Sequence, residues 1–488
     1  MTDFLTIDWP TAAVFVPLAG AILAFAWPRQ AAALGIGTVL LTGLVVAVLV
    51  LQVLAEGAVV TRLGNWGAPL GIDLRADGLS VVLLAMTAGV GLFVSFGALD
   101  TFSPARASER MRRYFWPLWL LLLTGLNGAY LSTDVFNLYV MLEVIALAAV
   151  GLTVLSGRVE AVRAGLEYMY ASILGALLFL LGVGFIYLDL GRLDFVGLMA
   201  AEPSPALIAA LALMVAGMAL KTALFPLHVW LPQAHANATA PASALLSGLV
   251  VKVSLYIVLR LAQYMVPPSE LMVTLIGAMG AGAILWGSIQ ALRAERLKLL
   301  VAWSTVAQIG LIFVAFARSG AAGTAESWKT AALLMLAHGV AKAAMFLAAG
   351  RIKDEVGHDR IRDLDRSPIR PTLAQFTFAA AAISLIGLPP SLGFAGKWLL
   401  MEGALAGGYW HWIAVTMAGT LLSVAYFSRV LVSFLRFDRL RAPVGEHQGW
   451  ALADAAPLTL ALSALALGLL AAPILTVMGI GYPFGGAP

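Results

Sequence analysis

Long apolar runs constrain the fold of this 488-residue chain more than any other feature. A transmembrane helix needs about 20 consecutive apolar residues. Fourteen runs come close to that length or exceed it, and backbone in lipid must satisfy its own hydrogen bonds. Apolar residues make up 61% of the chain and charged residues 11%, against about 45–50% and 25% in soluble proteins. The sequence therefore predicts an all-α membrane protein. The runs lie at residues 11–27, 33–54, 78–98, 114–131, 135–155, 166–188, 205–226, 242–264, 270–290, 299–317, 329–350, 373–406, 410–435 and 455–476.

The composition also narrows the chemistry. The chain has no cysteine, which excludes disulfides, thiolate metal sites, iron–sulfur clusters and cysteine nucleophiles. No histidine or carboxylate pair has metal-ligand spacing, and no phosphate-binding loop or Ser-His-Asp arrangement is present. Basic residues are dispersed among the loops rather than gathered in a nucleic-acid footprint. We therefore expect no cofactor, no metal, no nucleic-acid partner and no enzymatic reaction on this chain.

Basic residues in the loops predict the orientation. The odd-numbered loops hold nineteen Lys and Arg residues and the even-numbered loops hold six. Cytoplasmic loops carry the excess of positive charge, so the odd loops are expected in the cytoplasm and both termini outside. The Ala-rich composition favours a bacterial plasma membrane. The longest polar stretch, residues 351–370, mixes both signs of charge and predicts a solvated cytoplasmic loop.

Charged residues inside the apolar runs are the candidates for function. A charge at the bilayer centre costs about 2.5–3.5 kcal/mol, and such residues usually mark an ion or proton path. The acidic candidate is Glu143, which lies in the middle of its run. His338 lies four residues before Lys342, so these two side chains share one helix face. The alternative is a set of buried ion pairs that only fix helix packing. The basic residues inside the runs are Lys221, Lys252, Lys342, Lys397 and Arg429.

Two of the apolar runs are interrupted by prolines. Pro226 follows Lys221 by five residues, and the pair at 389–390 precedes Lys397. Non-helical backbone at membrane depth survives only inside protein or beside a water-filled cavity. Interrupted helices in corresponding positions of two halves indicate an inverted repeat. The spans are the seventh and the twelfth, so we predict five-helix repeats of opposite topology at 114–264 (helices 4–8) and 270–435 (helices 9–13) within one membrane domain, 1–488. Two ordinary proline kinks are the alternative.

Buried titratable groups in this pattern can relay protons. Burial disfavours the charged form of a lysine and a nearby carboxylate favours it. Movement of Glu143 relative to Lys221 would therefore switch whether that lysine holds its proton. Lys252, Lys342 and Lys397 would carry the proton onward if water fills the gaps between them.

Several charged residues and histidines near the ends of the apolar runs are weaker candidates for function, and each also has a simpler interpretation. Asp134 stands at the outer edge of the fifth span, where a solvated end residue is the simpler interpretation. Glu402 either pairs with Lys397 or is an interfacial carboxylate. Arg429 is expected to extend its stem to the interface. His228 and His235 are expected in a loop or at a helix cap.

Three stretches carry a resemblance to a known family. The run from Lys221 to Lys252, with LFPLHVWLPQAHANATAPASALLSGLVVK, resembles the proton-translocating subunits shared by respiratory complex I and Mrp-type multisubunit Na+/H+ antiporters. LGNWGAPLGIDLRAD (63–77) and RYFWPLWLLLLTGLNGAYLSTDVFNLYVMLEV (113–144) are similar to the D subunit of Mrp antiporters. The stretch NATAPASALL is closer to complex I, and Gln308 stands where many complex I homologues have histidine.

The resemblance implies fourteen helices with two inverted five-helix repeats. It implies that Glu143 is the essential acid that modulates Lys221 in the broken seventh helix. Lys252 matches the lysine of the eighth helix, His338 with Lys342 matches the eleventh-helix pair, and Lys397 matches the lysine of the broken twelfth helix. The implied partners are other membrane subunits, including a larger homologous subunit.

The expected function is that of a secondary transporter subunit that couples proton movement to efflux of Na+ or another monovalent cation. The first alternative is a proton-pumping subunit of a redox complex, either a NADH dehydrogenase or a membrane hydrogenase. A scaffold subunit that conducts nothing and a free-standing solute carrier are the remaining alternatives.

Overall fold

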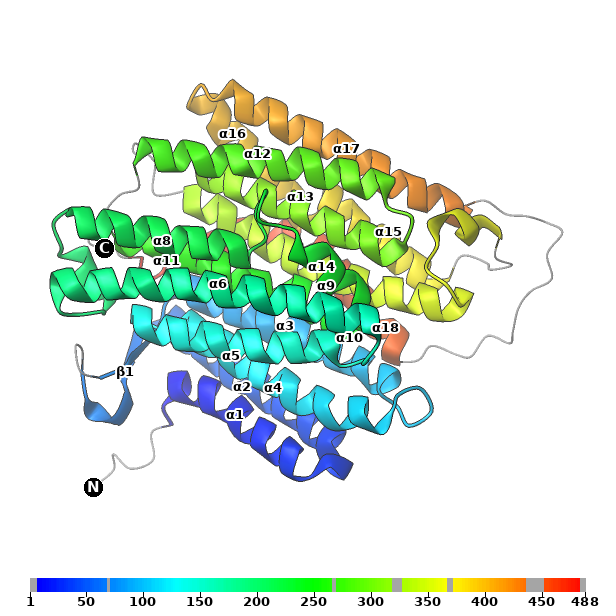
Figure 1. Ribbon diagram of the computed structural model, residues 1–488, viewed down its shortest axis with the longest axis horizontal. Coiled ribbons are helices and arrows are strands. Elements are labelled where there is room, and N and C mark those ends of the chain that lie inside the picture. The colour runs from blue at the N-terminus through cyan, green and yellow to red at the C-terminus, as the bar shows by residue number, and fades with distance from the viewer. Residues whose placement is uncertain are drawn as a thin grey trace.

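The computed structural model describes residues 7–67, 71–265, 269–317, 327–366, 372–435 and 452–482. In this part of the chain, long helices lie side by side in one bundle (Figure 1). The all-α membrane fold is confirmed, because eleven helical segments are long and apolar enough to cross a membrane. Helix α4 and the two interrupted segments α8–α9 and α15–α16 account for the other three predicted spans. The helices of the bundle are α1 (Trp9–Ala26), α2 (Ala31–Glu56), α3 (Gly78–Thr101), α4 (Glu109–Leu131), α5 (Val135–Val154), α6 (Val159–Leu190), α8 (Pro205–Lys221), α9 (Trp230–Asn237), α10 (Ala240–Leu245), α11 (Val251–Tyr264), α12 (Glu270–Arg293), α13 (Leu297–Ala317), α14 (Ser327–Val356), α15 (Leu373–Ile386), α16 (Leu392–Ala406), α17 (Trp410–Leu435), α18 (Leu452–Ala466) and α19 (Ala471–Met478).

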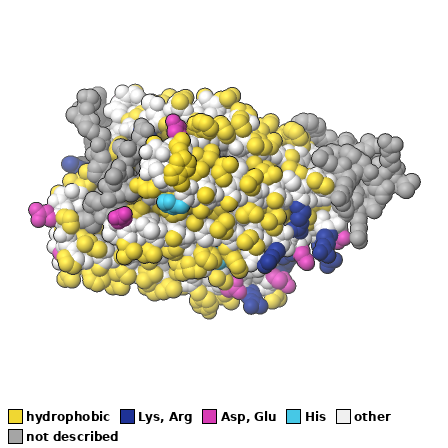
Figure 2. Space-filling view, turned by 90° about the horizontal axis from the view of Figure 1, so that it is seen from above, with side chains coloured by type: hydrophobic (Ala, Val, Ile, Leu, Met, Phe, Trp, Pro, Cys, Tyr) yellow, Lys and Arg dark blue, Asp and Glu magenta, His cyan; other side chains and the backbone are white. Residues whose placement is uncertain are grey.

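Two central segments are buried around their whole circumference. The segment formed by α10, a widened turn at Leu246–Val250 and α11 is enclosed by other helices over its apolar stretch, and so is α14 before its last turn. The outer helices instead present apolar side chains on the surface, while Lys and Arg gather toward one end of the face seen in Figure 2. A charged residue on α11 or α14 therefore lies at the centre of the bundle.

A short hairpin of strands β1 (Val59–Arg62) and β2 (Asp73–Ala76) closes one end of the bundle. The hydroxyl of Thr61 donates to Asp8, the cap of α1, at 2.8 Å. Arg75 donates to the carbonyl oxygen of Gly481 at 2.6 Å. The start of α1 and the segment after α19 therefore lie at the same end as the hairpin (Figure 1). Neither these strands nor the short helix α7 (Phe195–Met199) were predicted from the sequence.

Both predicted interruptions are present. Helix α8 ends at Lys221 and the chain resumes helical structure at Trp230, whose indole Nε1 donates to the carbonyl oxygen of Leu220 at 3.0 Å. Helix α15 ends at a left-handed glycine, Gly387, and α16 begins after Ser391, which caps it. The bounds of the two five-helix repeats remain a prediction.

The predicted solvated loop at 351–370 is wrong for its first part. Helix α14 continues to Val356, and a helical turn follows at Ile361–Arg366. Arg351 is half-buried and pairs with Asp100 of α3 at 2.6 Å and with Asp454 of α18 at 2.7 Å. Carboxylates from two neighbouring helices offset the cost of burying this guanidinium, and the helix therefore extends beyond the apolar run. Residues 367–371 lie outside the described part.

Candidate functional site

Glu143 and Lys221 form an ion pair between α5 and the end of α8. The Oε1 of Glu143 lies 4.0 Å from the Nζ of Lys221. Lys221 is buried and donates to the hydroxyl of Ser172 on α6 at 2.9 Å. The Glu143 side chain keeps 33% of its surface exposed. The two side chains are therefore close in the structure, and their joint action stays a prediction.

Lys252 lies fully buried at the start of α11, immediately after the widened turn. Its ammonium donates to the backbone carbonyl oxygen of Ser247, inside that turn. A wider turn leaves carbonyl groups without the usual partner four residues on, and such turns recur at functional sites. The local distortion thus supplies the acceptor that a buried lysine needs.

Lys342 lies on α14, opposite α13. Its ammonium donates to the carbonyl oxygen of Val301 at 2.8 Å and to the hydroxyl of Ser304. His338, one turn earlier, is buried, and neither of its ring nitrogens has a hydrogen-bond partner among the described residues.

Lys397 lies at the second interruption. Its ammonium donates to the carbonyl oxygens of Ile386 at 2.7 Å and Leu385 at 3.2 Å, and it approaches the hydroxyl of Thr420 at 3.4 Å. The last carbonyl groups of a helix carry partial negative charge and have no partner within it. The broken end of α15 therefore holds the ammonium in place of a carboxylate.

One face of α13 joins these lysine sites. Ser304 accepts from Lys342, and the hydroxyl of Thr305 lies 3.0 Å from the hydroxyl of Ser247, whose carbonyl group accepts from Lys252. The amide of Gln308 donates at 3.1 Å to the carbonyl oxygen of Leu385, which also accepts from Lys397. Positions i, i+3, i+4 and i+7 share one helix face. The residues of this polar stripe are Val301, Ser304, Thr305 and Gln308.

Small cavities lie beside the lysines at both interruptions. One, of about 10 Å³, is lined by Lys221, Ser172, Tyr168 and Ser254. Another, also of about 10 Å³, is lined by residues that include Lys397, Gln308 and Thr420. A volume of this order accommodates about one water molecule, and polar partners are present in both.

Comparison with known proteins places this arrangement in a family. The family model described as the transmembrane region of NADH:quinone oxidoreductase and Mrp antiporter subunits matches residues 132–423. The chain belongs to this family. Residues 132–423 include every one of the site residues described above.

Relatives from both branches of the family are similar to the chain. The N subunit of NADH-quinone oxidoreductase from Desulforudis audaxviator is 35% identical over 88% of this chain and 86% of its own length. The D subunit of the Na+/H+ antiporter from Alkalihalophilus pseudofirmus is 31% identical over 79% of this chain and 77% of its own. Sequence similarity therefore establishes an antiporter-like membrane subunit.

Solved structures share the fold. A chain of the Mrp complex from a Dietzia species aligns with a TM-score of 0.85 and 24% identity, covering 97% of both chains. A chain of an archaeal membrane-bound sulfane sulfur reductase aligns with a TM-score of 0.87 and 24% identity, covering 96% of both. Identities this low support the fold alone.

The structure shows Asp134 as a helix-end residue and Glu402 as an exposed carboxylate, in agreement with the simpler of the two interpretations given for Glu402. The side chain of Asp134 caps α5 by accepting from the amide of Asn137 at 2.8 Å, and burial raises its pKa. Glu402 does not pair with Lys397 among the described residues, and its side chain is exposed. Five residues rotate a helix by about 500°, so the two side chains leave α16 in different directions.

Arg429 extends its stem to the end of α12, where it donates to the carbonyl oxygens of Leu292 and Ala294. The interpretation of one histidine was wrong. His235 is fully buried in α9, not in a loop or at a cap, and neither ring nitrogen has a partner in the described chain. His228 does lie outside a helix, in the break between α8 and α9, but it is buried there.

Two residues counted as loop charges are also buried. Lys298 lies in the first turn of α13 and donates to the carbonyl oxygen of Ala238. Arg260 lies on α11 and pairs with Asp77 at 2.6 Å. Both stand at the edges of apolar runs, and the sequence contains no signal that separates a buried edge residue from a solvated one. The hydroxyl residues Ser172, Ser247, Ser304 and Thr305 were likewise missed, because Ser and Thr are frequent inside membrane helices.

Proposed function

We propose that this chain is the proton-conducting membrane subunit of a multisubunit antiporter that exchanges protons for Na+ or another monovalent cation. The observation that carries the proposal is the polar stripe on α13. Through it, hydroxyl, amide and carbonyl groups connect the surroundings of Lys252, Lys342 and Lys397. A scaffold subunit has no need for a connected row of titratable groups through its centre.

The relay begins at the ion pair. With Glu143 ionised 4.0 Å away, the charged form of Lys221 is favoured. Protonation of Glu143, or movement of α5, removes this support and releases the proton of Lys221 toward the adjoining water-sized cavity. Ser254 lines that cavity on α11, two residues from Lys252. Lys252, His338 and Lys342 then pass the proton along α13 to Lys397.

The exposure of Glu143 supports a partner subunit in the membrane. Its side chain is 33% exposed in the middle of a transmembrane helix, although its Oε1 is buried. Ionisable residues inside membranes almost always face protein or water, because a charge in contact with lipid is costly. Another membrane subunit would cover this face of α5, and a larger homologous subunit is the expected neighbour.

The proposed setting is a bacterial plasma membrane. The nineteen basic residues of the odd loops place these loops in the cytoplasm by the positive-inside rule. Both ends of the chain would then face outward. Protons and the exchanged cation are the only substrates proposed, and the driving force is the proton gradient.

A second candidate function is proton pumping within a redox complex. The 35% identity to an N subunit of NADH-quinone oxidoreductase favours this function. Lys397, Gln308 and the LGNW motif favour the antiporter. The same conducting residues would serve both, since only the source of energy differs.

Affinity purification from the native membrane, followed by mass spectrometry and transport measurement, tests the proposal. We expect only membrane subunits to be recovered, and the reconstituted assembly to move protons when a Na+ gradient is imposed. Recovery of flavin or iron–sulfur subunits would establish the redox alternative. An assembly of membrane subunits that moves no protons under any cation gradient would contradict both.

A further inference from the structure

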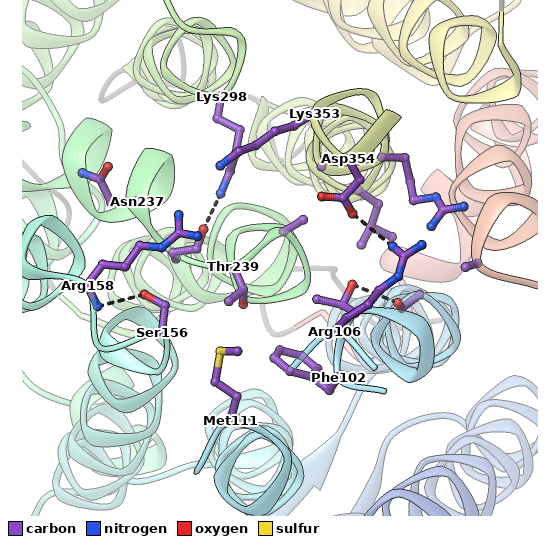
Figure 3. A pocket seen from close by; sticks show the side chains of 18 of the residues that line it. Phe102, Arg106, Met111, Ser156, Arg158, Asn237, Thr239, Lys298, Lys353 and Asp354 are labelled. Atoms are coloured by element: carbon purple, nitrogen blue, oxygen red, sulfur yellow. Dashed lines mark hydrogen bonds and ion pairs between the residues drawn. The ribbon is translucent and has the colours of Figure 1, made fainter. Parts of the chain in front are cut away.

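A large cavity opens at the end of the bundle opposite the β-hairpin. Its volume is about 620 Å³, within the range of small-molecule sites. Figure 3 shows its lining side chains, which come from the end of α3, the starts of α4 and α13, the α5–α6 and α9–α10 connections, and α14. Phe102, Met111 and Leu347 give it one apolar wall.

The basic residues on one wall of this cavity form ion pairs with carboxylates. On one wall, Arg106 lies 3.0 Å from Asp100 and 3.4 Å from Asp354. Arg351 on the same side pairs with Asp100 and Asp454. These guanidinium groups are therefore neutralised by carboxylates of neighbouring helices.

The opposite wall carries three cations that have no carboxylate within ion-pair distance in the described part of the chain. Arg158, Lys298 and Lys353 reach toward the same part of the cavity (Figure 3), and none of them forms an ion pair among the described residues. Lys298 is 4% exposed, whereas Lys353 is partly exposed and Arg158 is exposed. Neighbouring Arg296 is already occupied by Asp359 at 3.0 Å.

We infer that this wall binds a phosphate-class oxyanion, carried either by a free phosphate compound or by a phospholipid headgroup. The three convergent cations repel one another, most strongly at the buried ammonium of Lys298, where screening by water is weak. An oxyanion would remove that repulsion and accept charge-assisted hydrogen bonds from all three. The hydroxyls of Ser156 and Thr239 line the same cavity and can donate as well. This inference is independent of the proposed transport function.

Thermal unfolding of the full-length chain, purified with its co-purifying subunits, tests the site. Inorganic phosphate is titrated against chloride at equal ionic strength. We expect phosphate to raise the Tm in a saturable way. In Arg158→Gln and Lys353→Gln the apparent Kd should rise at least about tenfold, since each removes one charge-assisted contact. Lys353→Arg keeps the charge and should retain most of the affinity.

Arg163→Gln is the matched control. This arginine lies on α6 close to Arg158 in sequence, is 83% exposed and pairs with Glu167. Its response to phosphate should equal that of the wild type. The inference would be overturned if phosphate and chloride changed the Tm of the wild type equally and no lipid was bound. It would also be overturned if phosphate raised the Tm of Arg158→Gln and Lys353→Gln as it does that of the wild type.

Analysis of the lipid that the protein retains shows whether the oxyanion belongs to a phospholipid headgroup or to a free phosphate compound. Mass spectrometry of the purified protein after exchange into phosphatidylcholine, with and without phosphatidylglycerol, identifies retained lipid. Phosphatidylglycerol retained by the wild type and lost in Lys353→Gln indicates a headgroup, and a response to inorganic phosphate without retained lipid indicates a free compound. Both outcomes support the site. A third outcome would overturn the inference: phosphate has no effect on the Tm, and Lys353 is protected from amine labelling only while partner subunits are bound. An acidic segment of a partner subunit would then fill the cavity.

Discussion

The hydroxyl oxygens of Ser247 and Thr305 lie 3.0 Å apart in the buried centre of the bundle, and each belongs to the surroundings of a different buried lysine. The carbonyl group of Ser247 accepts from Lys252. The hydroxyl of Thr305 also lies 3.1 Å from the carbonyl oxygen of Val301, which accepts from Lys342. This hydroxyl pair is a direct polar link between the widened turn before α11 and helix α13.

Thr305→Val removes that link and keeps the shape of the side chain. A hydrogen bond contributes about 0.5–1.5 kcal/mol net, so we expect proton transport to fall about 2- to 10-fold while the assembled protein remains stable. Transport is measured by dye quenching in vesicles. Thr305→Ser should restore the rate, and a rate in Thr305→Val equal to that of the wild type would remove Thr305 from the path.

Glu143→Gln tests the start of the relay. The amide cannot hold a negative charge 4.0 Å from Lys221, so the switch of the lysine between its charged and neutral forms is lost. We expect transport to fall at least about tenfold, equivalent to about 1.4 kcal/mol in the barrier. Assembly with partner subunits should be retained, as judged by co-purification.

Glu160→Gln is the control for this change, because Glu160 is an exposed residue in the first turn of α6. It should transport as the wild type does. An assembled Glu143→Gln protein with normal transport would instead favour a scaffold role.

The Asp77–Arg260 pair should stabilise the fold in a pH-dependent way. Burial raises the pKa of Asp77, but Arg260 at 2.6 Å more than offsets this and holds the pKa below its usual range. The pair therefore contributes its full stabilisation above the pKa of Asp77 in the unfolded chain, about 3.9. This stabilisation is lost as the pH falls through the lower pKa of Asp77 in the folded protein. Asp77→Asn should cost about 3–5 kcal/mol, because it leaves a buried guanidinium unpaired.

Thermal unfolding of the wild type and of Asp77→Asn across a range of pH measures this effect. The difference in stability between the two should be constant between about pH 5 and 8 and become smaller only below about pH 4. Arg75 lies 4.0 Å from the same carboxylate with its side chain 30% exposed. Arg75→Gln should therefore cost less than about 1 kcal/mol, and an equal cost for both substitutions would contradict this interpretation of the pair.

Close packing across the second interruption depends on Gly393. A Cβ atom at this position would lie 2.0 Å from the carbonyl oxygen of Ser384 on α15. Gly393→Ala should therefore push α15 and α16 apart and destabilise the protein by about 1–3 kcal/mol. Since Lys397 on α16 donates to the end of α15, transport should fall as well.

Gly37→Ala in α2 is the matched substitution, because nothing lies within 4 Å of the added Cβ atom. Its Tm should stay unchanged or rise, since Ala favours helix over Gly by up to about 1 kcal/mol. A Tm of Gly393→Ala equal to that of Gly37→Ala would show that the helices adjust without strain.

Several features of the protein follow from the sequence by itself. Apolar length alone requires helices in lipid, so the fourteen spans and the all-α class could be predicted. Proline chemistry located the interruptions after Lys221 and before Lys397. The cost of charge in a membrane singled out Glu143, Lys252 and Lys342 as central, because only a compensating structure or function retains such residues.

Tertiary structure alone decided how these groups are connected. Ser304 and Thr305 are ordinary helix residues in the sequence, and Gln308 differs there only through the family resemblance. The role of all three depends on which helices α13 faces. Lys298 and Arg260 stand at span edges, where burial is decided by neighbouring chain segments far apart in sequence. Hydrogen bonding and ion pairing are short-ranged and directional, so they depend on packing between helices, whereas the cost of placing a charge in lipid acts on each residue separately.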